Sequence, residues 1–400
     1  MTTQLITAPA PPNPSSRRWS LVLLASPTAL AANSPVLLFD RLSSSLEEPL
    51  PLVVWVAIAF GLAAAVATPV TSAVLRRYGV TTVLVGCGAL VGAGSLLVVL
   101  APSLAVLACG RLAQGAGGAG LFTLAMTLAD STRVRGSITA ANGAIGAAGP
   151  LVGELLSTAV SWRLALSVSA VSLVAIPRVR HIAVSQMVAD RRTGTFDGIG
   201  AAAFAFLVTA LVLLPHIPAH AGVMAVLALI AVAIRIRVRP HGFVPLAVLR
   251  NGAFLTSSFL VLTLSTSYFA LLYLFPRLAS RCCGWEDGRV GFAQLAALLA
   301  GSLAAWCWTS WSRASQRVAI AVPVLAGGLT VALALANTSG ALLLVPAGAV
   351  FAATSGLAAL ISPATESAPT QDRSTATGLV MLAYLLGGAF GPNLASAVLN

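Results

Sequence analysis

Charged residues are scarce in this sequence. Only 8% of its 400 residues are charged, against roughly 25% in ordinary globular proteins. Eleven are acidic, and because lysine is absent all 23 basic residues are arginines. So few charges cannot cover a water-soluble surface when 58% of the chain is hydrophobic, and long apolar runs recur along its whole length. The composition therefore predicts an all-α polytopic membrane protein.

Side chains that carry catalytic or metal chemistry are also rare inside the apolar segments. None of the four histidines lies in such a segment, and Glu154 is the single carboxylate well inside one. A metal-assisted enzyme needs clustered ligands. We therefore expect no metal, no cofactor and no enzymatic activity. The arginines occur in pairs at the ends of apolar segments, a pattern of membrane orientation that argues against a nucleic-acid partner.

Helices that cross the hydrocarbon core of a bilayer need about 20 apolar residues. Thirteen segments of this sequence are predicted spans, of which the sixth and the eighth are short. They are Trp19–Phe39, Leu52–Leu75, Thr82–Leu100, Leu104–Leu128, Ile138–Val160, Leu164–Ile176, Ile199–Leu214, Gly222–Ile234, Phe254–Phe275, Val290–Trp311, Val318–Ala336, Ala341–Ile361 and Thr377–Leu399.

The positions of the arginines orient these spans. With the N-terminus in the cytoplasm, seventeen arginines fall on the cytoplasmic side and five on the other, while Arg111 lies within a span. Such an excess follows the positive-inside rule. We therefore expect a multi-pass protein of the cell membrane, inner or plasma, with a cytoplasmic N-terminus.

Two neighbouring spans carry polar or glycine-rich motifs. The fourth contains R-L-A-Q-G-A-G, which places Arg111, Gln114, Gly115 and Gly117 among small apolar residues. A charge within the membrane is costly, so Arg111 is a functional candidate. The fifth contains G-A-I-G-A-A-G-P-L-V-G-E, in which glycines three or four residues apart also suit simple close packing of helices. Its named residues are Gly146, Gly149, Pro150 and Gly153.

These two motifs resemble the span-four and span-five signatures of the major facilitator superfamily, and the second resembles its antiporter motif. Further segments are similar to the fourteen-span drug:proton antiporter branch: Ser161-Trp162-Arg163, Phe196-Asp197, Pro245-Leu246 and Leu249-Arg250. The resemblance implies two helical bundles with two spans inserted between them. It divides the chain into a disordered cytoplasmic tail (1–18), an N-terminal six-helix bundle (19–180), a linker with two central spans (181–240) and a C-terminal bundle (241–400).

An internal repeat supports this division. The run Gly146–Leu151 recurs as Gly388–Asn393, 242 residues later, so the fifth span matches the thirteenth. Parallel halves are a known plan of transporters, and by the same offset the ninth span should match the first. The C-terminal bundle then has five spans, one fewer than expected.

The sequence also departs from the family pattern at charged positions. In the loop after the second span, Arg77 and Gly79 match, whereas Ser72 and Arg76 replace the usual glycine and acid. In the first span, Thr28 stands where the antiporter branch has an acid, if Asn33 is the asparagine that follows it. These departures leave the coupling of transport to protons open.

Glu154 and Arg111 are the central candidates for proton coupling. Each lies about seven residues from the outer end of its span, near Leu104 and near Ser161, which places both about 10 Å deep. Burying either charge alone is costly, so we expect the two to pair. Glu154 is then either a static counter-ion or a carboxylate that titrates during transport.

A third candidate for coupling is Asp130, at the inner end of the fourth span. With Arg133 and Arg135 it resembles a charged latch expected beside Arg77, and the alternative is a solvated helix cap. Polar residues of other spans are candidates for a substrate cavity, although serine and threonine often bond back to their own helix. They are Thr28, Asn33, Thr263, Tyr268, Gln294 and Asn393.

The predicted function is secondary active efflux of lipophilic or cationic small molecules, such as drugs or natural products, by proton antiport with alternating access. One alternative is a proton-independent facilitator or lipid-handling carrier, because acids are missing from the first span and from the loop after the second. The other is a truncated non-transporting remnant, because a fourteenth span is missing.

Overall fold

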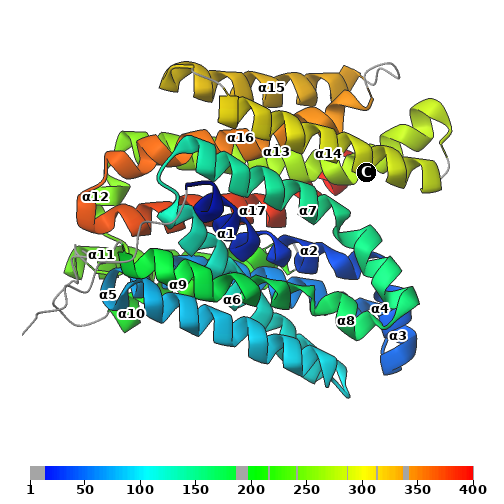
Figure 1. Ribbon diagram of the computed structural model, residues 1–400, viewed down its shortest axis with the longest axis horizontal. Helices are drawn as coiled ribbons and strands as arrows, with labels where there is room; N and C mark the ends of the chain where they lie inside the picture. Colours follow the sequence, from blue (N-terminus) through cyan, green and yellow to red (C-terminus); the bar gives the residue numbers. More distant parts are fainter. Residues whose placement is uncertain are drawn as a thin grey trace, which may run out of the picture.

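The computed structural model describes residues 14–185, 197–214, 217–239, 242–285, 287–311, 314–336 and 342–399. Within these ranges the chain is almost entirely helical and has no strand (Figure 1). Seven of the described helices are long and apolar enough to cross a membrane, judged by length and composition. The predicted all-α class is confirmed.

Most of the predicted spans each coincide with a long helix of their own. One helix, α5, carries both the second and the third predicted span, and the first and sixth are broken into short pieces. The long helices are α5 (Trp55–Val99), α6 (Leu104–Leu128), α7 (Thr132–Ala159), α10 (Gly198–Leu213), α11 (Pro218–Val238), α13 (Gly252–Cys283), α14 (Asp287–Trp311), α15 (Gln316–Ala336), α16 (Leu344–Glu366) and α17 (Arg373–Leu399).

Gly79 reverses the chain inside α5. Its backbone has φ 82° and ψ 177°, a region open essentially only to glycine. On either side of this bend the two halves of α5 pack against α6, Phe60 contacting Gly115 and Cys87 contacting Gly117. The second and third spans are therefore an antiparallel pair joined by almost no loop.

The first span is a broken helix. It consists of α1 (Pro14–Ala25), α2 (Pro27–Asn33), the 3-10 helix η1 (Ser34–Leu37) and α3 (Phe39–Leu46), followed by α4 (Leu50–Val53). Pro27 and Pro35 lack the amide hydrogen that a continuous helix needs. Because α1 begins at Pro14, residues 14–18 of the predicted tail are helical, and residues 1–13 lie outside the described ranges.

The sixth span is longer than predicted. Instead of ending at Ile176, the helical run extends through α8 (Trp162–Leu166), the 3-10 helix η2 (Val168–Ala175) and α9 (Ile176–Ser185). The prediction was too short because Pro177 and the arginines that follow interrupt the apolar pattern, although they continue the helix.

The helices pack in two groups joined by a hairpin. The first group contains α1–α9, and the second contains α13–α17, with the short helix α12 (Leu246–Leu249) leading into it. In the hairpin, α10 packs against α11, and α10 also contacts α5 and α17. The two groups meet where α7 packs against α14 and α16, and where α5 packs against α17 (Figure 1).

Candidate functional site

Arg111 lies completely buried in the first group of helices. Its Nη2 donates to the carbonyl of Ala31 at 2.9 Å, its Nη1 to Gln114 Oε1 at 3.1 Å, and its guanidinium lies 4.4 Å from the centre of the Phe60 ring. Because Pro35 lacks the amide hydrogen that would otherwise bond the Ala31 carbonyl, the break in the first span creates this acceptor. The predicted pairing of Arg111 with Glu154 is wrong.

Gln114 extends this buried network to the sixth span. Its Nε2 donates to Ser95 Oγ and to the carbonyl of Leu166, each at 3.1 Å. Leu166 is the last residue of α8, where helix carbonyls lack partners within their own helix. The side chains of Arg111 and Gln114 therefore hold the ends of both broken spans against α6.

Glu154 pairs instead with Arg41, at 3.3 Å between Oε1 and Nη2. Arg41 also donates from Nη1 to Ser157 Oγ at 2.6 Å. About a third of the Glu154 side chain is exposed, at 35%. The sequence missed this partner because the break in the first span starts the new helix α3, which carries Arg41 back onto α7.

Asp130 does not form the latch expected beside Arg77. Asp130 Oδ2 accepts from Arg17 Nη1 at 2.9 Å, and Arg17 also donates to the carbonyl of Leu128 at the end of α6. Arg77 lies over the ring of Tyr78, 5.4 Å from its centre. The Asp130 side chain is 56% exposed, so it belongs to a surface pair at the end of a helix.

A buried ion pair joins the two groups at this same end. Arg76 Nη1 lies 3.1 Å from Asp372 Oδ1, and the exposed fractions of the two side chains are 8% and 1%. Asp372 directly precedes α17, where a negative charge is favoured by the helix dipole. Arg76, which stands where the family pattern has an acid, is therefore paired with an acid of the second group. Sequence analysis missed this pair because its two residues lie 296 positions apart.

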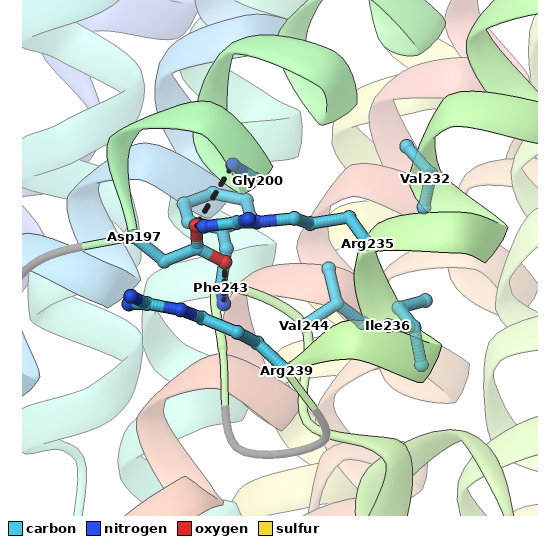
Figure 2. A pocket seen from close by; sticks show the side chains of 8 residues that line it. All are labelled: Asp197, Gly200, Val232, Arg235, Ile236, Arg239, Phe243 and Val244. Carbon is cyan, nitrogen blue, oxygen red and sulfur yellow. Dashed lines mark hydrogen bonds and ion pairs between the residues drawn. The ribbon is translucent and has the colours of Figure 1, made fainter.

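A second ion pair lies within the hairpin, where it joins the start of α10 to the end of α11. Asp197 Oδ1 caps α10 through the Gly200 amide at 3.0 Å and accepts from Arg235 Nη2 at 2.6 Å. Figure 2 shows that Arg239, from the same end of α11, also extends toward this carboxylate. Burial alone would raise the pKa of Asp197, but the hydrogen bonds from Arg235 and two backbone amides together lower it below the usual range.

The backbone of one residue, Phe243, connects the two ion pairs. The Phe243 amide donates to Asp197 Oδ2 at 3.1 Å, and the Phe243 carbonyl accepts from Arg76 Nη2 at 3.3 Å. We call the set Arg76, Asp372, Phe243, Asp197 and Arg235 the latch. It joins the first group, the hairpin and the second group at one end of the molecule, which we call the latch end.

Neighbouring contacts close the latch end further. Arg133 Nε donates to the Ser310 carbonyl at 2.7 Å, and Trp306 Nε1 donates to Ser137 Oγ at 3.1 Å, so α7 is bonded to α14. Gly378 leaves room for the side chain of Ser72, where α17 crosses α5.

The hydrophobic clusters also differ between the two ends of the molecule. The largest cluster mixes both groups at the latch end and includes Leu75, Ile138, Leu360 and Val380. At the opposite end, one cluster around Leu38 and Trp162 is built from the first group alone, and another around Phe275 and Val290 is built from the second group alone. Contact between the groups is therefore concentrated at the latch end.

A family model described as the Major Facilitator Superfamily matches residues 19–392. The chain belongs to this superfamily. It resembles the efflux pump dotC of Dothistroma septosporum, with 34% identity over 116 residues, covering 27% of this chain and 20% of that protein. The matched part thus spans about a fifth of the curated relative.

A solved structure of another protein supports the same fold. The human organic anion transporter MFSD10 (TETRAN) superposes with a TM-score of 0.65, covering 97% of this chain and 94% of that one, at 16% identity. At this identity the likeness concerns the fold alone. The chain is thus a multi-pass membrane protein of a transporter family.

The glycine motifs of this superfamily member mediate close packing. Gly146, Gly149 and Gly153 lie against Asn33 and Ser34 of the broken first span, and in the second group Gly388 and Gly391 lie against Phe269 of α13. The repeat detected in the sequence therefore corresponds to the same helix contact in each group. Pro150 lies within α7.

The two cavity candidates of the first group form hydrogen bonds within that group. Thr28 is buried, donates to the Ala25 carbonyl at 2.7 Å and packs against Gly118. Asn33 donates from Nδ2 to the Gly146 carbonyl at 3.0 Å. Both side chains therefore stabilise the break in the first span.

The candidates of the second group differ in position. Gln294 Nε2 donates to the Leu272 carbonyl at 2.7 Å, and Tyr268 is buried. Thr263 is exposed and donates to the carbonyl of Phe259 on its own helix. The side chain of Asn393 lies outside the part that the structure describes.

Two aromatic side chains that sequence analysis overlooked, Phe269 and Tyr384, lie beside the cavity candidate Tyr268. The ring centres of Phe269 and Tyr384 are 6.1 Å apart, and those of Tyr268 and Phe269 are 4.7 Å apart. These rings belong to α13 and α17, and Ala147 of α7 packs against the same cluster. We call Ala147, Tyr268, Phe269 and Tyr384 the aromatic wall.

Proposed function

We propose that this chain exports lipophilic small molecules by alternating access, as a member of the fourteen-span drug:proton antiporter branch. Membership of a transporter superfamily and the partial likeness to a fungal efflux pump support this proposal. The moving units are the predicted N-terminal bundle (19–180) and C-terminal bundle (241–400), with residues 181–240 as the linker between them.

The observation that carries this proposal is the one-sided contact between the two groups of helices. One described ion pair and a mixed hydrophobic cluster join them at the latch end, whereas the clusters at the opposite end each belong to one group. Rocking about the middle would break the first set of contacts while the opposite end closes. We assign the latch end to the cytoplasm because the arginine excess lies there, so this conformation opens outward.

We further propose that proton entry drives export, with Glu154 as the proton-binding group. Glu154 is the single carboxylate well inside a predicted span, and its exposed third makes it reachable from the outer side. Protonation would release Arg41 and so loosen the contact of α3 with α7. A change in the packing of α7 would reach the second group because α7 also contacts α14.

The test is export by purified protein in proteoliposomes with an imposed proton gradient. We expect a lipophilic fluorescent dye to accumulate against its gradient and a protonophore to abolish that accumulation. Glu154→Gln should leave folded protein that no longer concentrates the dye. Glu47→Gln, an exposed acid near the end of α3, is the matched control and should concentrate the dye normally. Accumulation by the Glu154→Gln protein would refute its role in coupling.

A proton-independent carrier is the second candidate. It is favoured by Thr28, which occupies the position of the expected acid and donates to the carbonyl of Ala25 at the end of α1. For such a carrier the same dye would equilibrate across the membrane without accumulating, and the protonophore would have no effect on its rate.

A further inference from the structure

We infer that the transport pathway admits uncharged and anionic substrates and rejects organic cations. The inference rests on the proposed export function and concerns the charge of the molecule exported. Three features carry it: the scarcity of carboxylates within the membrane, the unneutralised charge of Arg111, and the uncharged aromatic wall.

Carboxylates that could balance a cation are missing along the spans. Glu154 is the single acid well inside a predicted span, and it is held by Arg41. At the latch end Asp197 and Asp372 are buried and paired with arginines. A cation leaving water needs a partner of opposite charge to offset the loss of its hydration. Within the described ranges, the carboxylates of Glu154, Asp197 and Asp372 are thus each already paired with an arginine.

Arg111 adds a buried positive charge to the first group of helices. Its described contacts are the carbonyls of Ala31 and Val56, the amide of Gln114 and the ring of Phe60. These groups are neutral, so they satisfy the hydrogen bonds of the guanidinium without cancelling its charge. In a low-dielectric surrounding such a charge acts over many ångströms, because neither water nor salt screens it.

The aromatic wall adds no charge of its own. It consists of three aromatic rings and a methyl group, and Gly143 of α7 lies beside Ser302 and Thr354 of the second group. Flat aromatic substrates suit such a surface because rings stack on rings. Attraction of a cation to aromatic rings contributes about 0.5–2 kcal/mol, which offsets only part of the several kcal/mol that an ion loses on leaving water.

Competition between matched substrates tests the inference. The probes are three fluorescent aromatic amides of one scaffold that end in a carboxylate, a neutral methyl amide or a trimethylammonium group. In proteoliposomes we expect the cationic probe to be exported at least about tenfold more slowly than the other two, a factor that corresponds to about 1.4 kcal/mol. Equal or faster export of the cation overturns the inference and leaves the proposed export function standing.

Adding a carboxylate to the aromatic wall tests the cause. Ala147→Asp should raise export of the cationic probe relative to the neutral one, whereas the isosteric control Ala147→Asn should not. An equal effect of the two substitutions would attribute selectivity to shape, and would overturn the electrostatic inference. If the parent protein exports none of the three probes, the proposed function fails and the inference fails with it.

Discussion

Single residues show how this chain tolerates charge in an apolar interior. Arg111 is fully buried, and the described contacts of its guanidinium are carbonyl and amide oxygens and an aromatic ring rather than a carboxylate. The break at Pro35 supplies one of those oxygens, because the Ala31 carbonyl has lost its normal donor. The break in the first span therefore supplies an acceptor for the arginine buried in the fourth span.

Replacing Arg111 should destabilise the protein strongly. Arg111→Ala would leave buried acceptors at Ala31 and Gln114 without their charged donor, and we expect a loss of about 3 kcal/mol in the free energy of unfolding. Thermal unfolding in detergent, followed by a thiol-reactive dye, measures the change. Arg178→Ala, at an exposed position of α9, is the control and should leave the unfolding midpoint unchanged. Equal midpoints for the two variants would contradict the buried network.

At the scale of the element, bends and breaks in helices determine which side chains meet. Gly79 turns α5 back on itself, and the broken first span brings Arg41 to Glu154. A continuous first span would have carried residue 41 away from α7. These irregularities fall at glycine and proline, the residues whose backbone freedom is respectively largest and smallest.

Gly79 itself can be tested by adding one methyl group. Nothing lies within 4 Å of a Cβ at this position, so a loss of stability in Gly79→Ala would reflect backbone strain alone. For this conformation we expect a cost of about 1–3 kcal/mol. Gly86→Ala is the matched control, because Gly86 has the same free space within regular helix of α5. Similar unfolding midpoints for both variants would contradict the reversal at Gly79.

The molecule as a whole is closed at one end by contacts between residues far apart in the chain. The latch reaches from Arg76 through the backbone of Phe243 to Asp197, and from Arg76 to Asp372. The hairpin is thereby connected to the arginine of the ion pair that joins the two groups. Separation of the two groups at this end must break the pair of Arg76 and Asp372.

Breaking the latch should therefore shift the protein toward a state open at this end. Asp372→Asn strands a buried arginine, and we expect faster labelling of a reporter, Ser310→Cys, which is 4% exposed at the interface between the groups. The measurement is the rate of reaction with a polar maleimide in a cysteine-free background. Arg76→Asp combined with Asp372→Arg should restore slow labelling.

A second reporter controls for general loosening of the structure. Ser44→Cys, exposed at the opposite end, should react at one rate in all variants. If Asp372→Asn leaves the labelling of Ser310→Cys unchanged, the Arg76 and Asp372 pair does not hold this end closed.

Local sequence was enough to predict the helical class, the positions of most spans and the close packing at the glycine motifs. These features depend on hydrophobic length and on the small size of glycine, both of which are written in neighbouring residues. The internal repeat likewise predicted that the thirteenth span packs as the fifth does, and the contacts of Gly146 and Gly388 agree.

Only the tertiary structure decided which charges pair. Asp372 lies 296 residues beyond Arg76, and Arg41 meets Glu154 because the first span breaks before Arg41. Ion pairing depends on distances of a few ångströms, whereas spacing along the chain predicts distance only within a continuous helix. Because the first span is broken, Glu154 pairs with Arg41 and not with Arg111.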